Sequence, residues 1–221
     1  MTEMPRGLFI TFEGTDGSGK TTQIGMFLAR LRAAGYDAVQ TAEPGGTVIG
    51  NQIRKILLDP ANVELAPRAE MLLYFASRAQ NVAEVIRPSI AAGRIVVCDR
   101  FTDSTLAYQG AGRGLGEETV LALHEVACGE LQPDLTFFLD IDLKTGLERA
   151  RRRNENEGTH DQSRMDEQSI EFHRQVRDAY LRLAASHPER FRVVDASLDP
   201  EGVHAAIWRH TEAALESRVH A

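Results

Sequence analysis

The sequence has few cysteines and no long apolar run. Its two cysteines, Cys98 and Cys128, form neither a CxxC pair nor part of a secretory pattern. This excludes a disulfide framework and a zinc site, and we expect two buried thiols in a reducing compartment. There is no apolar run of about 18 residues, the length that a membrane span needs. The amino-terminal segment has no basic, apolar leader, so the sequence predicts a cytoplasmic protein.

An excess of positive charge is also absent. The 25 lysines and arginines are outnumbered by 32 acidic residues, which gives a formal net charge of −7. No overall positive field therefore exists to attract a nucleic-acid backbone, and any anion site has to be local. Because 43% of the 221 residues are hydrophobic, we expect a single domain, 1–221, with a core of its own.

The chain does contain a complete phosphate-binding motif. Residues 14–21 read GTDGSGKT, which fits GxxxxGK[ST], between the apolar run LFITFE and the helical pattern TTQIGMFLARLRAAG. In this setting glycines turn backbone N–H groups towards phosphate oxygens, Lys20 adds a cation and the Thr21 hydroxyl can bind Mg²⁺. The motif predicts a nucleoside triphosphate site. Its expected contacts are Gly14, Thr15, Asp16, Gly17, Ser18, Gly19, Lys20, Thr21 and Thr22.

Short apolar runs alternate with helical patterns along the chain. The strand-like runs are 8–12, 36–41, 94–98, 135–141 and 191–195. Because parallel strands need crossovers, this alternation predicts an α/β fold, the three-layer P-loop NTPase fold with a five-stranded parallel sheet covered by helices on both faces. The expected helices are 20–34, 47–58, 67–92 with a kink at Pro88, 117–130, 143–153, 166–186 and 200–217.

Useful polar residues follow the predicted strands. In such a sheet, ligands bind beyond the carboxyl ends of the strands. Asp99 ends a buried strand and is well placed to hold a water of Mg²⁺, while Arg100 offers a planar fork to a second phosphate. The polar segment 154–163, NENEGTHDQS, lies between two predicted helices and suits a mobile lid over the site.

In order along the chain, from Leu8 to Asp195, a set of segments resembles the bacterial thymidylate kinases. They are FEGTDGSGKTTQ, EPGGT at 43–47, YFASR at 74–78, DRFTDSTLAYQGAGRG at 99–114, PDLTFFLDI at 133–141 and ERARRR at 148–153. The resemblance implies transfer of the γ-phosphoryl group of ATP to dTMP with Mg²⁺, giving dTDP and ADP for dTTP synthesis. It also implies a homodimer, through long helices such as 67–92 and 117–130.

The resemblance further implies how dTMP is recognised. Tyr74 and Arg78, four residues apart on one helix face, would stack on the base and bond its carbonyl edge. Thr105 would contact the thymine edge, Tyr108 would crowd the ribose 2′ position and so select deoxyribose, and Asp16 would contact the 3′-hydroxyl. Each has a plainer interpretation: core packing for Tyr74, a half-buried helix aromatic for Tyr108 and a solvated loop acid for Asp16.

Arginines would supply the remaining positive charge. Arg100 and Arg54 resemble the family's acceptor-phosphate arginines. Position 17 is glycine where some family members carry arginine, and the resemblance suggests that Arg149, Arg153 or both supply the missing charge from a lid at about 149–165. A basic helix end favoured by the macrodipole is the alternative. The predicted catalytic residues are Lys20, Asp16, Arg100, Arg149 and Arg153, and the predicted metal ligands are Thr21 and Asp99.

Two departures from the family pattern and three rival functions remain. Ala42 stands where relatives often carry arginine, and the lid insert is longer and more acidic than the pattern.

A kinase of another nucleoside monophosphate or of a deoxynucleoside would share the fold and the loop. A GTP-binding switch would need an NKxD segment, which the sequence lacks. A P-loop ATPase acting on macromolecules would ordinarily be larger or show a basic face.

Overall fold

The computed structural model describes residues 6–157 and 168–219, and at 151, 153–157 and 216–219 it describes the backbone alone. Its sheet has the strand order β2-β3-β1-β4-β5, and the paired strands are all parallel. The strands are β1 Phe9–Glu13, β2 Ala38–Ala42, β3 Ile95–Asp99, β4 Leu135–Asp140 and β5 Phe191–Asp195. All five predicted strands are therefore confirmed.

Helices connect and cover the strands. They are α1 Lys20–Ala33, α2 Val48–Leu58, α3 Pro67–Asn81, α4 Arg87–Ala91, α5 Thr102–Thr105, α6 Glu117–Cys128, α7 Leu143–Glu157, α8 Ile170–Ser186 and α9 Pro200–Val219. Two π-helical segments, η1 Val82–Ile86 and η2 Leu106–Gly112, continue α3 and α5. The predicted helices did not include α5 and η2, because the glycines and β-branched residues there favour no regular helical period.

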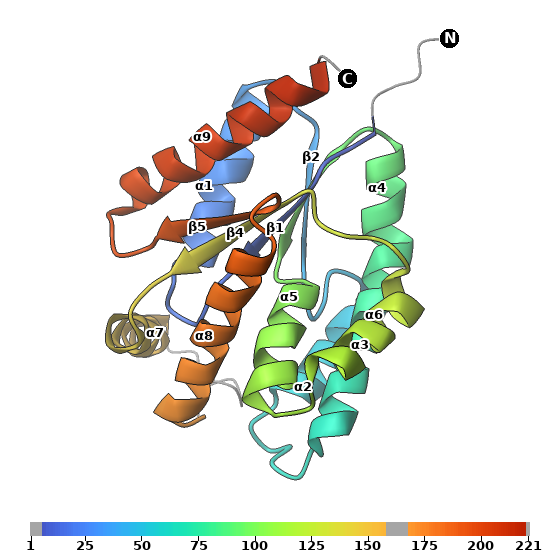
Figure 1. Ribbon diagram of the computed structural model, residues 1–221, viewed down its shortest axis with the longest axis vertical. Helices are drawn as coiled ribbons and strands as arrows, with labels where there is room; N and C mark the ends of the chain where they lie inside the picture. The colour runs from blue at the N-terminus through green and yellow to red at the C-terminus, as the bar shows by residue number, and fades with distance from the viewer. Residues whose placement is uncertain (1–5, 158–167, 220–221) are drawn as a thin grey trace.

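Alternate residues of the strands enter hydrophobic clusters on the two faces of the sheet. On one face, Phe12 of β1 and Phe137 of β4 pack with Phe27 of α1, which in turn meets Trp208 of α9. Helices α1 and α9 lie together on this side of the sheet, and α3 to α6 and α8 lie on the other (Figure 1). This arrangement confirms the three-layer α/β fold predicted from the sequence.

The predicted helix boundaries differ from the structure at several ends; α8, for example, begins at Ile170 rather than at 166. The helix expected at 67–92 is broken into α3, η1 and α4, with Pro88 in the first turn of α4. Proline has no N–H and clashes with the carbonyl four residues earlier, which explains the widened π turn before it. Helix α7 continues to Glu157, into the predicted polar loop, while the rest of that loop, 158–167, lies outside the described residues.

The expectations for the cysteines agree with the structure. Cys98 and Cys128 are free and buried, with 0% and 1% of their surface exposed. Burial raises the pKa of both thiols, so both remain protonated at neutral pH. Among the described helices, none combines the length and the apolar character that crossing a membrane requires.

Candidate active site

A cavity of about 1400 Å³ opens beyond the carboxyl ends of the central strands. One side is formed by the phosphate loop, residues 14–21, and the start of α1, and the other by α2, α3 and the acceptor loop, which we define as residues 99–105. Pockets for one small ligand typically measure ~300–1,000 Å³. The cavity is therefore large enough for two ligands that face each other.

The phosphate loop turns its backbone into this cavity. Of the predicted contacts, residues 16–22 line the cavity, whereas Gly14 and Thr15 are buried in the loop's floor. Gly19 caps α1 with a φ of 89° and no side-chain bond, so the first N–H groups of α1 face the loop. Amides and a helix dipole in this arrangement favour an anion, and the phosphate contacts expected from the sequence stay a prediction.

Gly17 lies against the helix that carries the arginine cluster. Its φ is +76°, and a Cβ added there would come within 2.0 Å of the carbonyl oxygen of Gly146 in α7. No larger side chain fits in this arrangement. The glycine at position 17 is thus matched by the close approach of α7 to the phosphate loop.

Lys20 is held over the loop by its own backbone. Its Nζ donates to the carbonyls of Gly14 at 3.0 Å and Thr15 at 3.1 Å. Burial, assisted by the nearby Arg100, lowers the pKa of this ammonium to about 8. The charge is therefore poorly solvated, and a phosphate dianion beside it is strongly favoured.

The predicted metal ligands lie around the same loop. Thr21 is exposed at the start of α1, and Asp99 ends β3 and lines the cavity. Oδ1 of Asp99 is buried and has no hydrogen-bond partner among the described residues. Among the described residues, no group of three or more His, Cys, Asp or Glu side chains is arranged to hold a metal ion by itself. Such a sparse oxygen set fits Mg²⁺, which keeps several waters and binds phosphates rather than an all-protein cage.

Arg100 projects into the cavity from an unusual backbone conformation. With a φ of 69°, it is the single non-glycine residue of positive φ within the described ranges. Its guanidinium donates to Asp16 at 2.9 Å and Ser104 at 3.2 Å and lies 5.0 Å from the centre of the Tyr108 ring. The structure thus brings together three of the residues predicted to bind the acceptor: Arg100, Asp16 and Tyr108.

Arg78 is buried beside the acceptor loop. With 1% of its side chain exposed, it donates from Nε to Glu43 at 2.5 Å and from Nη2 to the Thr105 hydroxyl at 3.0 Å. Burial raises the pKa of Glu43, and the arginine opposes this shift. Nη1 of Arg78 remains buried without a partner in the described part of the chain. The arginine therefore has a donor left for a ligand in the cavity.

Further residues complete this wall of the cavity. Tyr74 is half-buried, and Tyr108 is 5% exposed with a hydroxyl that has no described partner. Gln109, which the sequence analysis missed, also lines the cavity and donates to the buried Glu70 at 2.9 Å. The position of Gln109 next to Tyr108 could have indicated that it lies near the site, but nothing in the sequence indicated its contact with Glu70.

Arg54 and Ala42 also line the cavity. Arg54 of α2 donates to the carbonyl of Pro44 at 2.8 Å and lines the cavity, as does Ala42 at the end of β2. Arg54 thus reaches the predicted acceptor side. No side chain beyond a methyl group comes from position 42.

The arginine cluster is described in part. Arg149 lines the cavity and donates to the carbonyl of Ala196 at 2.9 Å, next to the apolar wall formed by Leu198 and Val203. This places Arg149 at the end of the cavity beyond the phosphate loop. The side chain of Arg153 lies outside the described residues.

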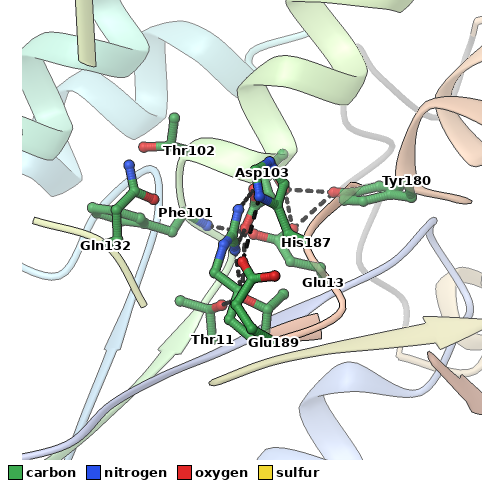
Figure 2. A network of polar contacts seen from close by, with 12 residues as sticks. Thr11, Glu13, Phe101, Thr102, Asp103, Gln132, Tyr180, His187 and Glu189 are labelled. Atoms are coloured by element: carbon green, nitrogen blue, oxygen red, sulfur yellow. Dashed lines mark hydrogen bonds and ion pairs between the residues drawn. The ribbon is translucent and has the colours of Figure 1, made fainter. Parts of the chain in front are cut away.

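A buried polar network that the sequence did not predict underlies the acceptor loop. Figure 2 shows Glu13, at the end of β1, among Phe101, Asp103 and Tyr180. Burial raises the pKa of Glu13 to about 7; the Asp103 carboxylate adds to the shift, and bonds from Ser104 and Tyr180 oppose it. The position of Glu13 at the end of a predicted strand was a signal in the sequence, but its hydrogen-bond partners are too distant in sequence to be predicted.

Comparison with known proteins gives a consistent result. The family model for thymidylate kinase matches residues 12–207. The chain is 53% identical over 201 residues to a thymidylate kinase of Pelobacter propionicus, covering 91% of this chain and 92% of the relative. It is 48% identical over 217 residues to that of Deinococcus radiodurans, covering 98% and 100%. A crystal structure of thymidylate kinase from Ehrlichia chaffeensis superposes with a TM-score of 0.72 at 32% identity, over 94% of this chain and 99% of that one.

Proposed function

The chain belongs to the thymidylate kinase family, and we propose that it transfers the γ-phosphoryl group of ATP to dTMP in the cavity described above, giving ADP and dTDP. The observation that carries this proposal is one cavity with a phosphate loop on one side and Arg78, Arg100 and Tyr108 on the other. Two phosphorylated ligands that face each other across such a cavity are the arrangement that phosphoryl transfer needs.

ATP binds with its β- and γ-phosphates in the phosphate loop. The amides of residues 14–21 and the buried Lys20 surround the phosphates, while the apolar wall of Leu198 and Val203 receives the base. Arg149, which lies beside the wall that receives the base, and Arg153 add positive charge around the bound ATP. Support for Arg149 comes from its place on the cavity wall, whereas Arg153 rests on the sequence resemblance.

Mg²⁺ is the cofactor that we propose. Thr21 and, through water, Asp99 would hold it, and the buried, unpartnered Oδ1 of Asp99 supports this choice. When bound, the ion neutralises charge on the phosphate oxygens. The protein residues orient the two substrates and exclude water from them.

On the acceptor side, Arg100 and Arg54 bind the phosphate of dTMP. Asp16 keeps Arg100 in place and contacts the 3′-hydroxyl. The acceptor phosphate is already ionised, so no general base is required. Arg78, Thr105 and Tyr74 contact the thymine base. The free donor of Arg78, next to the Thr105 hydroxyl, supports recognition of a base carbonyl.

Sugar selection falls to Tyr108. Its ring is packed against Phe172 and Tyr180, with centroids 6.0 and 6.4 Å away. A ring fixed in this way cannot move aside for a 2′-hydroxyl, so the site rejects ribonucleotides by a steric clash.

A panel of acceptors tests the proposal. ADP release from ATP and Mg²⁺ is measured with dTMP, dUMP, UMP, AMP, GMP, CMP and thymidine in separate reactions. We expect strong turnover with dTMP and weak turnover with the others. If AMP or thymidine is turned over preferentially, the role of the phosphate loop in binding ATP is retained and the residues assigned to dTMP are rejected. If ATP binds but no acceptor increases turnover, a nucleotide-binding switch is favoured.

We also propose that residues 1–221 form one domain, and that the protein is a cytoplasmic homodimer. Exposed apolar side chains on neighbouring helices support the dimer: Leu72 of α3 is 54% exposed, and Leu121 and Val126 of α6 are 42% and 86% exposed. Sedimentation of the wild type and of a Leu72→Glu variant tests it, with a dimer expected for the first and a monomer for the second.

A further inference from the structure

Glu13 directly precedes the phosphate loop in the sequence, and its carboxyl group is fully buried. Burial makes a negative charge on this group energetically costly. None of its surface is exposed, and it accepts hydrogen bonds from the Phe101 amide at 2.7 Å, the Ser104 hydroxyl at 2.6 Å and the Tyr180 hydroxyl at 2.8 Å. Two of these three donors belong to the acceptor loop. Glu13 thus connects the strand that carries the phosphate loop to the segment that carries Arg100.

The backbone of Arg100 is held on both sides in its left-handed conformation. Its own amide donates to the carbonyl of Phe12 at 3.0 Å, and the next amide, of Phe101, donates to Glu13. The thiol of Cys98 donates to the carbonyl of Arg100 at 3.0 Å. A residue with a Cβ avoids this conformation unless its surroundings impose it, and Glu13 makes the shortest of these three contacts.

The side chain of Arg100 is linked to Glu13 as well. Nη1 of Arg100 donates to the Ser104 hydroxyl, which itself donates to Glu13. Tyr180 meets both Ser104 and Glu13, and its ring stacks on Phe138 with centroids 4.9 Å apart. Glu13 therefore fixes both the backbone and the guanidinium of Arg100 without reaching the cavity itself.

We propose that Glu13 is a positioning residue for Arg100, and that it holds the guanidinium in the orientation that receives the acceptor's phosphate. This proposal rests on the acceptor-phosphate role given to Arg100 above. It predicts that the loss of Glu13 weakens recognition of the phosphate and leaves recognition of the nucleoside intact. A role confined to overall stability would weaken both alike.

Equilibrium binding of dTMP and of thymidine, which lacks the phosphate, separates these cases. In Glu13→Ala we expect the dissociation constant for dTMP to rise about tenfold or more, because the buried hydrogen-bond network that orients Arg100 is lost. The constant for thymidine should stay near the wild-type value. Glu13→Gln keeps an oxygen acceptor for the Phe101 amide and should restore most of the dTMP affinity. Equal losses for both ligands in Glu13→Ala would overturn the proposal.

Two further variants keep the test decisive. Should Glu13→Ala not fold, Ser104→Ala removes the link between Glu13 and the guanidinium and should lower the dTMP-to-thymidine affinity ratio alone; an unchanged ratio rejects the proposal. Asp140→Ala is the control, because it removes a strand-end carboxylate outside the cavity, whose described partner is Arg177. It should reduce thermal stability without altering the ratio.

The Arg100→Ala variant distinguishes a failure of this proposal from a failure of the acceptor-phosphate role of Arg100, on which it rests. If Arg100→Ala leaves the affinity ratio unchanged, Arg100 does not bind the acceptor's phosphate and the proposed function of that residue fails. If Arg100→Ala lowers the ratio and neither Glu13→Ala nor Ser104→Ala does, Arg100 keeps its role and the positioning role of Glu13 is rejected.

Discussion

The Arg100 guanidinium donates to the Asp16 carboxylate at 2.9 Å, and this contact joins the acceptor loop to the phosphate loop. Both side chains are partly exposed in the cavity, at 19% and 23%. A pair of this kind contributes about 0–1 kcal/mol to stability. Its main effect is therefore to orient Arg100 between the two substrates.

Removal of the Asp16 carboxylate should affect catalysis more than folding. In Asp16→Ala we expect kcat/KM for dTMP to fall about a hundredfold, because Arg100 loses its orientation and the sugar loses a contact. The melting temperature should be almost unchanged. Asp37→Ala, which breaks the exposed pair between Asp37 and Arg94, is the control and should retain full activity. Normal activity of Asp16→Ala would reject the role.

Lys20 should be essential for turnover and dispensable for folding. Lys20→Ala should reduce kcat by about 10²–10³-fold, because a charge next to the transferred phosphoryl group is lost. Burial already disfavours the charged lysine, so the melting temperature should not fall. Lys55, exposed at the rim of the same cavity, provides the control. Comparable losses in Lys20→Ala and Lys55→Ala would contradict a specific role.

Tyr108 should control the choice of sugar through the bulk of its ring. Tyr108→Ala should raise kcat/KM for ribothymidylate relative to dTMP, whereas Tyr108→Phe keeps the ring and should change this ratio much less. Because the tyrosine hydroxyl is buried without a described partner, Tyr108→Phe should fold at least as stably as the wild type. An unchanged ratio in Tyr108→Ala would remove this role.

Glu13 should make stability depend on pH. Burial raises its folded-state pKa from 4.5 to about 7, the Asp103 carboxylate adds to the shift, and Arg100 opposes it. Between these values the folded protein binds more protons than the unfolded chain, so the contribution of Glu13 is complete below pH 4.5 and is lost as the pH rises through 7. Glu13→Gln should abolish that loss, which is on the order of 3 kcal/mol. Denaturant unfolding at a series of pH values measures it, and parallel profiles for both proteins would contradict the assignment.

The fold and the position of the phosphate loop between β1 and α1 were predictable, because their signals are local. The phosphate motif spans adjacent residues, and the apolar runs of the strands recur at regular intervals. The contacts that hold the acceptor loop in place were not predictable, because they join residues that are distant in the sequence. Glu13 meets Phe101 across 88 residues and Tyr180 across 167, and neither periodicity nor a short motif carries such information.

The break in the helix predicted at 67–92 has a similar origin. Proline at 88 signals a disturbance, but whether the chain kinks or forms a π turn depends on how η1 packs against its neighbours. The lid stays a prediction, because α7 reaches Glu157 and the segment 158–167 lies outside the described residues.

The most direct test of the central claim follows the phosphoryl group itself. The purified protein is incubated with ATP labelled at the γ-phosphate, Mg²⁺ and dTMP, and the products are separated. The account predicts that the label appears in dTDP in a one-to-one ratio with ADP, and that Lys20→Ala abolishes this transfer. Label released as inorganic phosphate while dTMP stays unmodified would contradict it.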